Sequence, residues 1–136
     1  KSEGSTYLYR NNHAFPRAWL ADNLIKVASE KEELAALFDL KENLDRTVVT
    51  SENINISPSP LAPDDYLKIN LWSDNKIIIN TRTQTEKILV LSEIYYPNWK
   101  VKLDGKNSEI KRINYILRGI PLEKGEHVIE LYPSII

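Results

Sequence analysis

Apolar and polar residues alternate along most of the second half of the chain, with the period of a β-strand that has one buried face. Between residues 66 and 83 a Ser-Asp-Asn turn at 73–75 separates two such stretches and predicts a hairpin. Residues 99–103 alternate up to Asp104-Gly105, which is a strong turn signal. Further strands are predicted at residues 109–115, 116–122 and 126–132, the last two joined by a tight turn at 123–125.

Residues 86–93 differ from the alternating strands because the four successive apolar residues 88–91 leave no polar face. We therefore predict a strand that is buried on both faces and lies centrally in its sheet. Earlier strands are predicted at residues 6–10, 18–21 with 24–28 as its continuation, and 47–50, and three prolines within 57–63 predict a loop. Many short strands with turns about every 8 to 12 residues indicate an antiparallel β-sandwich, jelly-roll-like, rather than a parallel sheet.

A helical period follows residue 29. Ser29 and Glu32 form a capping-box pattern, and the acidic first turn suits the positive end of a helix dipole. Leu34, Leu37 and Phe38 form one apolar stripe, and the helix is predicted to end near Asp39. The predicted fold class is thus α+β, mainly β: an antiparallel β-sandwich with one short N-terminal helix.

Composition supports one folded domain, 1–136, with a lead-in over residues 1–56 and the main sandwich strands over 64–133. The length of 136 residues and the 42% of hydrophobic residues are those of an ordinary globular domain. The near balance of 18 basic and 19 acidic residues argues against a nucleic-acid-binding surface. No apolar run approaches the ~20 residues that span a bilayer. The chain lacks an initiator methionine, so we expect it to be part of a longer protein.

Candidate catalytic groups are sparse. His13 and His127 have no Ser, Asp or Glu at a spacing that singles them out, and His127 is expected at the sheet margin with one hydrogen bond. Asp64 and Asp65 follow the proline loop without further ligands, so a solvated helix-like turn or the entrance to a strand is expected rather than a metal site. The glycines are isolated, so no phosphate-binding loop is predicted. We expect no catalytic, metal-binding or cofactor-binding residue.

The aromatic residues are the remaining candidates for binding, because exposed Trp and Tyr rings stack on the apolar faces of sugars. Trp99 begins an alternating strand and is expected in the core. Tyr95, Tyr96 and Trp72 are left open between core and surface. A carbohydrate-binding module would use the following residues: Tyr95, Tyr96, Asn98 and Arg118.

Several short motifs, in one order and at compatible spacing, resemble the C-terminal extracytoplasmic region of the YfhO family of bacterial membrane proteins. They are FPRAWL at 15–20, LVLSE at 89–93, YYPNW at 95–99, DGK at 104–106, RINY at 112–115, LRGI at 117–120 and KGEH at 124–127. The helix resembles that region as well, whereas residues 40–53 match only loosely. The family usually has glycine before the tryptophan; here it is Asn98, which tolerates a left-handed backbone better than other non-glycine residues.

This resemblance implies a parent protein with many transmembrane helices, similar in plan to lipid-sugar-dependent glycosyltransferases of the envelope, some linked to teichoic acid glycosylation. Any catalytic carboxylates would belong to the membrane portion, so none is assigned here. The expected function is a non-catalytic accessory domain on the extracytoplasmic face, in contact with the membrane-embedded part of its own chain and with envelope glycan. The alternatives are a carbohydrate-binding module and a structural interaction domain, which an exposed apolar patch of more than a few hundred Å² would favour.

Overall fold

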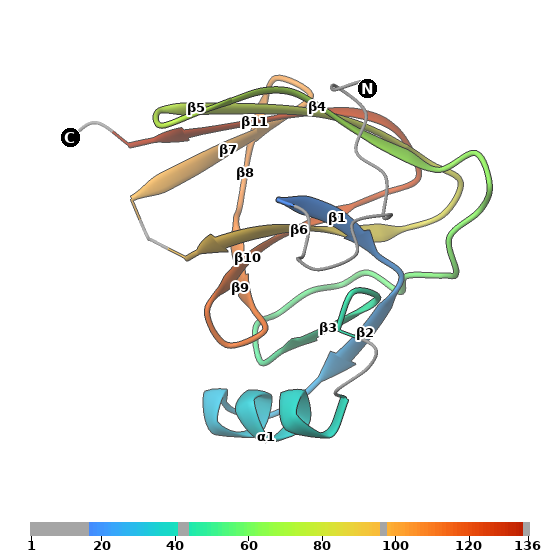
Figure 1. Ribbon diagram of the computed structural model, residues 1–136, viewed down its shortest axis with the longest axis vertical. Coiled ribbons are helices and arrows are strands. Elements are labelled where there is room, and N and C mark those ends of the chain that lie inside the picture. The colour runs from blue at the N-terminus through green and yellow to red at the C-terminus, as the bar shows by residue number, and fades with distance from the viewer. Residues whose placement is uncertain (1–16, 41–43, 96–97, 135–136) are drawn as a thin grey trace.

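The computed structural model describes residues 17–40, 44–95 and 98–134, and their strands form two antiparallel sheets that face each other (Figure 1). The four-stranded sheet has the order β1 (Ala18–Ala21), β6 (Lys87–Ile94), β10 (Leu117–Leu122) and β9 (Lys111–Ile113). The five-stranded sheet has the order β4 (Tyr66–Ser73), β5 (Lys76–Thr83), β11 (Gly125–Pro133), β7 (Trp99–Leu103) and β8 (Lys106–Ser108). The predicted class, α+β and mainly β with antiparallel sheets, is confirmed.

A third, smaller layer lies beneath the four-stranded sheet (Figure 1). It is the parallel pair of β2 (Asn23–Lys26) and β3 (Thr47–Thr50), with the helix α1 (Glu30–Leu40) beyond it. Residues 24–28, predicted as an extended continuation of the strand at 18–21, are extended up to Lys26, but they belong to the separate strand β2. Asp22 separates β1 from β2, because its carboxylate binds the Arg46 guanidinium (Nη2 to Oδ2, 2.9 Å) and its backbone amide bonds the Arg46 carbonyl.

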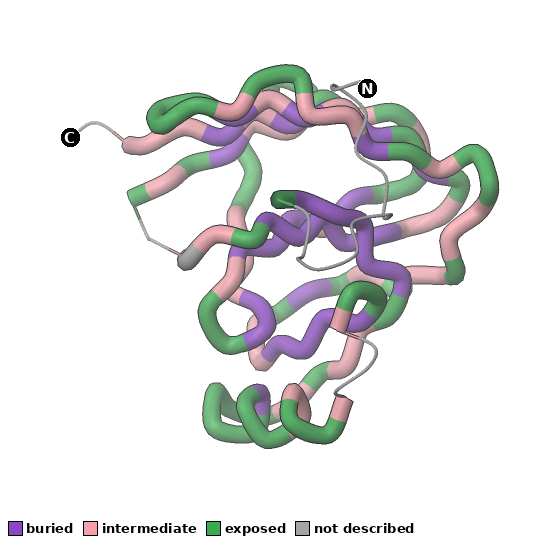
Figure 2. Tube along the Cα trace, in the orientation of Figure 1, coloured by how far each residue is buried: buried purple, intermediate pink, exposed green. Residues whose placement is uncertain are grey.

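Two apolar cores fill the spaces between these three layers. The core between the two large sheets includes Leu89 and Leu91 of β6, and the core between the four-stranded sheet and the β2–β3 layer includes Ile88 and Val90. The middle layer is accordingly the most deeply buried (Figure 2). This confirms that residues 86–93 form a central strand buried on both faces.

Two of the predicted turns are present, whereas one predicted strand differs. The β4–β5 hairpin is present, and Asp104 and Gly105 join β7 to β8 with left-handed φ values of 55° and 83°. The strand predicted at 109–115 is shortened to β9, however, because the chain leaves the five-stranded sheet after β8 and crosses to the four-stranded sheet before β9 begins. The strand predicted at residues 6–10 lies outside the described residues.

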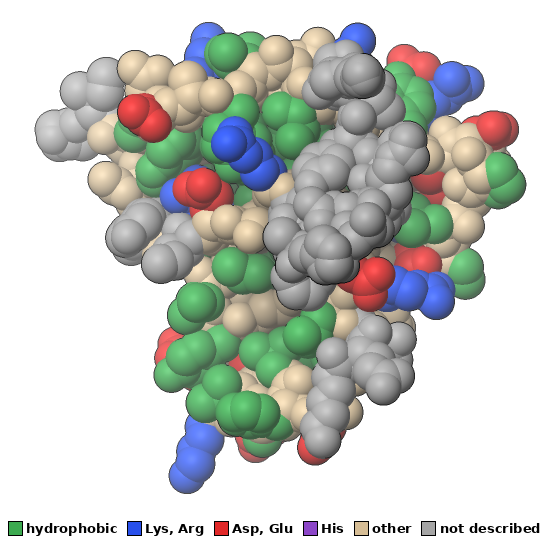
Figure 3. All heavy atoms as spheres, in the orientation of Figure 1, with side chains coloured by type: hydrophobic (Ala, Val, Ile, Leu, Met, Phe, Trp, Pro, Cys, Tyr) green, Lys and Arg blue, Asp and Glu red, His purple; other side chains and the backbone are tan. Residues whose placement is uncertain are grey.

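The helix α1 begins where the capping box predicts, but its faces are reversed. Ser29 Oγ accepts a hydrogen bond from the Glu32 amide (3.2 Å), while Glu32 reaches the amide of Ala28 rather than that of Ser29. The apolar stripe does not form a buried face, because Leu34 is 40% exposed and Phe38 is 69% exposed. Hydrophobic side chains consequently gather on the surface over α1 (Figure 3).

The buried residue of α1 is Glu33, whose carboxylate joins the helix to two distant segments. Its oxygens accept a two-pronged contact from Arg112 (2.8 and 2.9 Å), two hydrogen bonds from Ser51 and one from the Tyr115 amide (2.9 Å). Burial of Glu33 would raise its pKa, but the hydrogen bonds from Arg112, Ser51 and Tyr115 outweigh burial and lower the pKa below its ordinary value. This buried ion pair fixes α1 against β3 and the β9–β10 turn.

Gly119 in β10 is required by close packing. A Cβ atom at this position would lie 2.8 Å from Ile113 Cγ2 and 2.9 Å from Ile113 Cδ1, and Ile113 is itself fully buried. We expect Gly119→Ala to lower the free energy of unfolding by about 2 kcal/mol through overpacking, measured by urea denaturation. Ile113→Ala removes the atoms that the new Cβ meets, so the double variant should lose less stability than the sum of the two single losses. Additive losses would contradict the clash.

Candidate functional site

A pocket of about 510 Å³ opens where the chain crosses from β8 in one sheet to β9 in the other. Three aromatic side chains line it, namely Tyr95, Trp99 and Tyr132. Tyr95 follows β6, and its amide donates to the Ile116 carbonyl at 2.7 Å. The β7–β11 pairing sets Tyr132 opposite Lys100, next to Trp99. We call this site the aromatic pocket.

Polar groups complete the aromatic pocket: Glu52, Lys100, Asn107, Ser108, Glu109 and Lys111. Lys111 Nζ lies 2.8 Å from Glu109 Oε1, and this hydrogen bond with its charge attraction lowers the pKa of Glu109. Glu109 is therefore held as a carboxylate, which suits hydrogen-bond acceptance better than proton donation. A pocket with aromatic rings, hydroxyl and amide groups and charges of both signs matches the chemistry of a polyol ligand.

The four residues predicted for sugar contact are placed differently from one another. Tyr95 is half-buried and lines the aromatic pocket, and Asn98 is exposed just before β7. Tyr96 lies outside the described residues. Arg118 is only 1% exposed, and its guanidinium carbon lies 4.5 Å from the centre of the Trp99 ring. Arg118 thus supports Trp99 from within the protein instead of forming part of the pocket wall.

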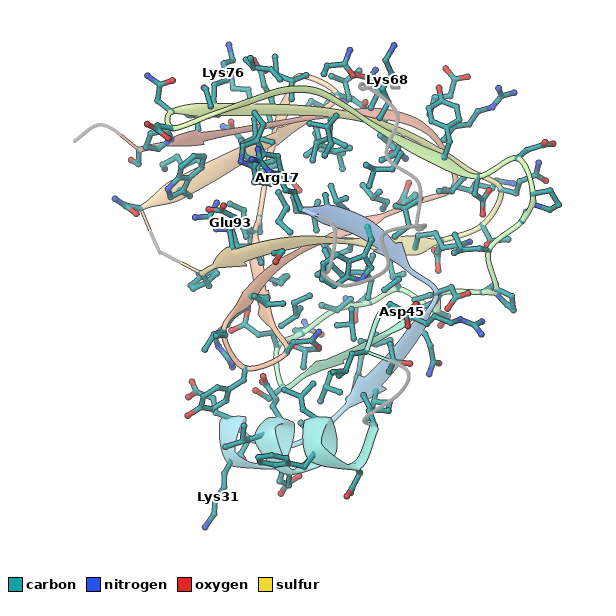
Figure 4. The ribbon with its side chains drawn as sticks, in the orientation of Figure 1. Arg17, Lys31, Asp45, Lys68, Lys76 and Glu93 are labelled. Carbon is teal, nitrogen blue, oxygen red and sulfur yellow. The ribbon has the colours of Figure 1, made fainter. Side chains whose placement is uncertain are left out.

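Trp99 is neither fully in the core nor at the surface. It is half-buried, packs against the core between the two large sheets and also lines the aromatic pocket. Trp72, left open by the sequence, is also half-buried and packs against the same core, and the Arg17 guanidinium carbon lies 5.2 Å from its ring centre. Figure 4 shows Arg17 with Glu93 in the space between the sheets, and Glu93 lies 4.0 Å from Arg118.

Two predictions about ionisable residues need correction. His127 makes two contacts rather than one, because Nδ1 lies 2.7 Å from Asp104 Oδ2 and Nε2 lies 2.7 Å from the Glu123 carbonyl. Asp65 is not solvated: its side chain is 1% exposed and lies 3.5 Å from the equally buried ammonium of Lys87. Both residues therefore stabilise turns. His13 lies outside the described residues.

Two features of the structure were not predicted from the sequence. Tyr132 enters the aromatic pocket only through the β7–β11 register, for which the sequence offered no signal. Lys87, by contrast, begins the apolar run of β6, and a lysine at the end of a strand buried on both faces is a sign that a buried partner exists. Within the described ranges, no cluster of three or more His, Asp or Glu side chains could hold a metal ion.

The fold defines an antiparallel β-sandwich with a pocket lined by aromatic rings. The family model for the bacterial membrane protein YfhO matches residues 62–132, from just before β4 through most of β11. The chain therefore belongs to the YfhO family, as its motifs suggested.

A 68-residue segment is 29% identical to the uncharacterized protein YfhO of Bacillus subtilis strain 168. That alignment covers 48% of this chain and 8% of the relative, so the chain corresponds to a small part of the relative's length. No solved structure matches the chain. In the part of the chain that the structure describes, no helix has the length and apolar character needed to cross a membrane.

Proposed function

We propose that this chain is a non-catalytic accessory domain on the extracytoplasmic side of a YfhO-type membrane protein, and that it holds envelope glycan in the aromatic pocket. The observation that supports the proposal is the convergence of Tyr95, Trp99 and Tyr132 on one pocket of about 510 Å³. Rings at such a site can stack on the C–H faces of a sugar, while neighbouring polar groups bind its hydroxyls.

The ligand that fits this pocket is uncharged or of mixed charge. Lysines and glutamates both line the pocket, and Lys111 is already paired with Glu109. A strongly anionic polymer would meet the two carboxylates, whereas a hexose or a sugar on a polyol chain can use donors and acceptors together. This agrees with the lipid-linked sugar that the family resemblance implies, whereas the anionic phosphate backbone of a teichoic acid is not the ligand expected in this pocket.

The share of the family protein that the chain represents supports the accessory role. The match covers 8% of the B. subtilis relative, so any glycosyl transfer would be performed by the rest of the protein, which belongs to a membrane protein family. Residues 1–136 would then act as one domain that holds a sugar near a membrane-embedded site. Glycosyl transfer from a lipid-linked or nucleotide sugar by the purified chain alone would contradict the accessory role.

Titration of the chain by two-dimensional NMR tests the binding. A monosaccharide of roughly 12 non-hydrogen atoms, at about 0.3 kcal/mol per atom, should bind with a Kd of about 2 mM. Hexoses, N-acetylhexosamines and glycerol phosphate oligomers are the ligands to compare. We expect shifts in β7, β8 and β9 and a roughly tenfold weaker Kd for Tyr95→Ala, which removes one stacking ring.

The matched control is Tyr66→Ala, because Tyr66 is 41% exposed on β4 and does not line the pocket. This variant should bind as the unmodified chain does. Sugar binding is refuted if no ligand shifts the pocket resonances at tens of millimolar, or if the two tyrosine variants lose affinity equally.

A further inference from the structure

The helix α1 presents apolar side chains to solvent, and its buried side carries the Glu33 carboxylate. Leu34, Ala35 and Phe38 follow the helical repeat and form one apolar stripe, and all three are exposed. Phe38 is the most exposed large apolar side chain of the described residues at 69%. A helix of this kind contributes little apolar burial to its own fold, so its exposed stripe is available to a partner.

The apolar stripe continues on the neighbouring β9–β10 turn. Tyr115 is 39% exposed and Ile116 is 46% exposed, and the amide of Tyr115 donates to Glu33 of α1 at 2.9 Å. Arg112 in turn donates to the Tyr115 carbonyl at 2.9 Å. We define the α1 face by five exposed residues: Leu34, Ala35, Phe38, Tyr115 and Ile116.

The α1 face is held rigidly in its outward orientation. Tyr115 has a left-handed φ of 74°, which is unfavourable for a side chain with a Cβ atom, and the turn keeps it through the hydrogen bonds to Glu33 and Arg112. Asn114 pairs with Val49 of β3 through its side chain and its amide, both at 2.7 Å. A preorganised apolar surface loses little conformational entropy when a partner binds it.

The charges around the α1 face indicate which partner suits it. The exposed charged residues of α1 are three carboxylates and one ammonium: Glu30, Glu32, Asp39 and Lys31. A second copy would bring acidic residues against acidic residues, and an anionic lipid surface would repel them. The complementary surface has an apolar centre and Lys or Arg at its edge.

We infer that the α1 face docks on the membrane-embedded part of the same protein, on a surface of that chemistry. The chain belongs to a membrane protein family. It covers 8% of its relative, so a protein of that length would have much further polypeptide that could cover the α1 face. Docking of the α1 face would fix the aromatic pocket relative to the membrane. The inference requires family membership but not sugar binding, and its test uses no sugar.

Cysteine labelling provides the test, because the chain contains no cysteine. Ala35→Cys places one thiol inside the α1 face and leaves Phe38 intact. Its rate of maleimide labelling is compared between the isolated chain and a full-length, otherwise cysteine-free protein in membrane vesicles. We expect labelling to be at least tenfold slower in the full-length protein. Val128→Cys is the control, because Val128 is 44% exposed on β11 and should label equally in both.

Second substitutions identify the contacts that cause the protection. Phe38→Ser removes the apolar centre and Asp39→Lys reverses one charge, and each should restore fast labelling of Ala35→Cys in the full-length protein. Tyr66→Ser changes an exposed aromatic outside the α1 face and should not. Equal labelling in both proteins overturns the inference. So does concentration-dependent protection of the isolated chain, which indicates self-association, or its protection by anionic lipid vesicles alone.

Discussion

Glu33→Gln should lower the free energy of unfolding by about 3 kcal/mol, although the new side chain has nearly the same shape. The groups around Glu33 are the Arg112 guanidinium, the Ser51 and Tyr115 amides and the Ser51 hydroxyl, and the guanidinium and amides can only donate. A glutamine must turn its own NH₂ group toward some of these donors. It also removes the buried countercharge of Arg112, whose side chain is 14% exposed, and leaves the guanidinium with the exposed Glu30 carboxylate at 3.7 Å.

Thermal and urea unfolding measure this loss, and a melting temperature lowered by about 10 °C is expected for a chain of this length. Glu32→Gln is the matched control, because Glu32 is one residue away on the same helix, is exposed and accepts one hydrogen bond that glutamine can also accept. It should change stability by less than about 0.5 kcal/mol. Similar losses for both variants would mean that the Glu33 ion pair does not fix α1.

The effect of Glu33→Gln should depend on pH with a definite sign. The pKa of Glu33 is lowered in the folded chain, so its ionised form stabilises the fold above the unfolded pKa of about 4.3. That contribution is lost as the pH falls through the folded pKa, since protonation then removes the ion pair. The stability difference between the unmodified chain and Glu33→Gln should thus be constant near neutral pH and shrink below about pH 4. A difference that grows in acid would contradict this assignment.

The strands were predictable because period and turn chemistry are local properties. β6 was placed centrally from four apolar residues in succession, and the β7–β8 turn from Asp104-Gly105. The orientation of α1 was not predictable in this way. The spacing of its apolar residues predicted that Leu34 and Phe38 face the core. The helix is instead oriented by Glu33, whose partners Ser51, Arg112 and Tyr115 lie 18, 79 and 82 residues away in the sequence.

The same limit applies to the candidate site. The segment around Tyr95 and Trp99 stood out by its aromatic content, and the structure places both residues at one pocket. Arg118 was grouped with them by its motif, but strand parity points it inward, with Ile120 and Leu122, under the Trp99 ring. Tyr132 needed the β7–β11 register. Residue type thus indicated the candidates, while the sheet pairing decided which of them share a surface.

The second large effect is expected at the buried pair of Lys87 and Asp65. Lys87→Met keeps the length of the side chain but removes the cation that faces a carboxylate with 1% exposure. Asp65 Oδ2 would keep the Ala62 amide at 2.8 Å and Oδ1 the Gln84 amide at 2.9 Å, yet its charge would be buried without a countercharge. We expect a loss of about 3 kcal/mol in urea denaturation.

Asp65→Asn should cost at least as much, because it removes the countercharge of the buried Lys87 ammonium. Its NH₂ group must also face one of two backbone amides that can only donate, those of Ala62 and Gln84. The variant that carries both Lys87→Met and Asp65→Asn should lose about 1 to 3 kcal/mol less than the sum of the two single losses, which a double-mutant cycle measures. Lys76→Met is the matched control, since its pair with Glu130 spans 3.0 Å at side-chain exposures of 45% and 33%. An exposed pair contributes at most about 1 kcal/mol. If Lys87→Met loses no more stability than Lys76→Met, an unpaired charge at the buried Asp65 costs no more than one at the surface, and the prediction is wrong.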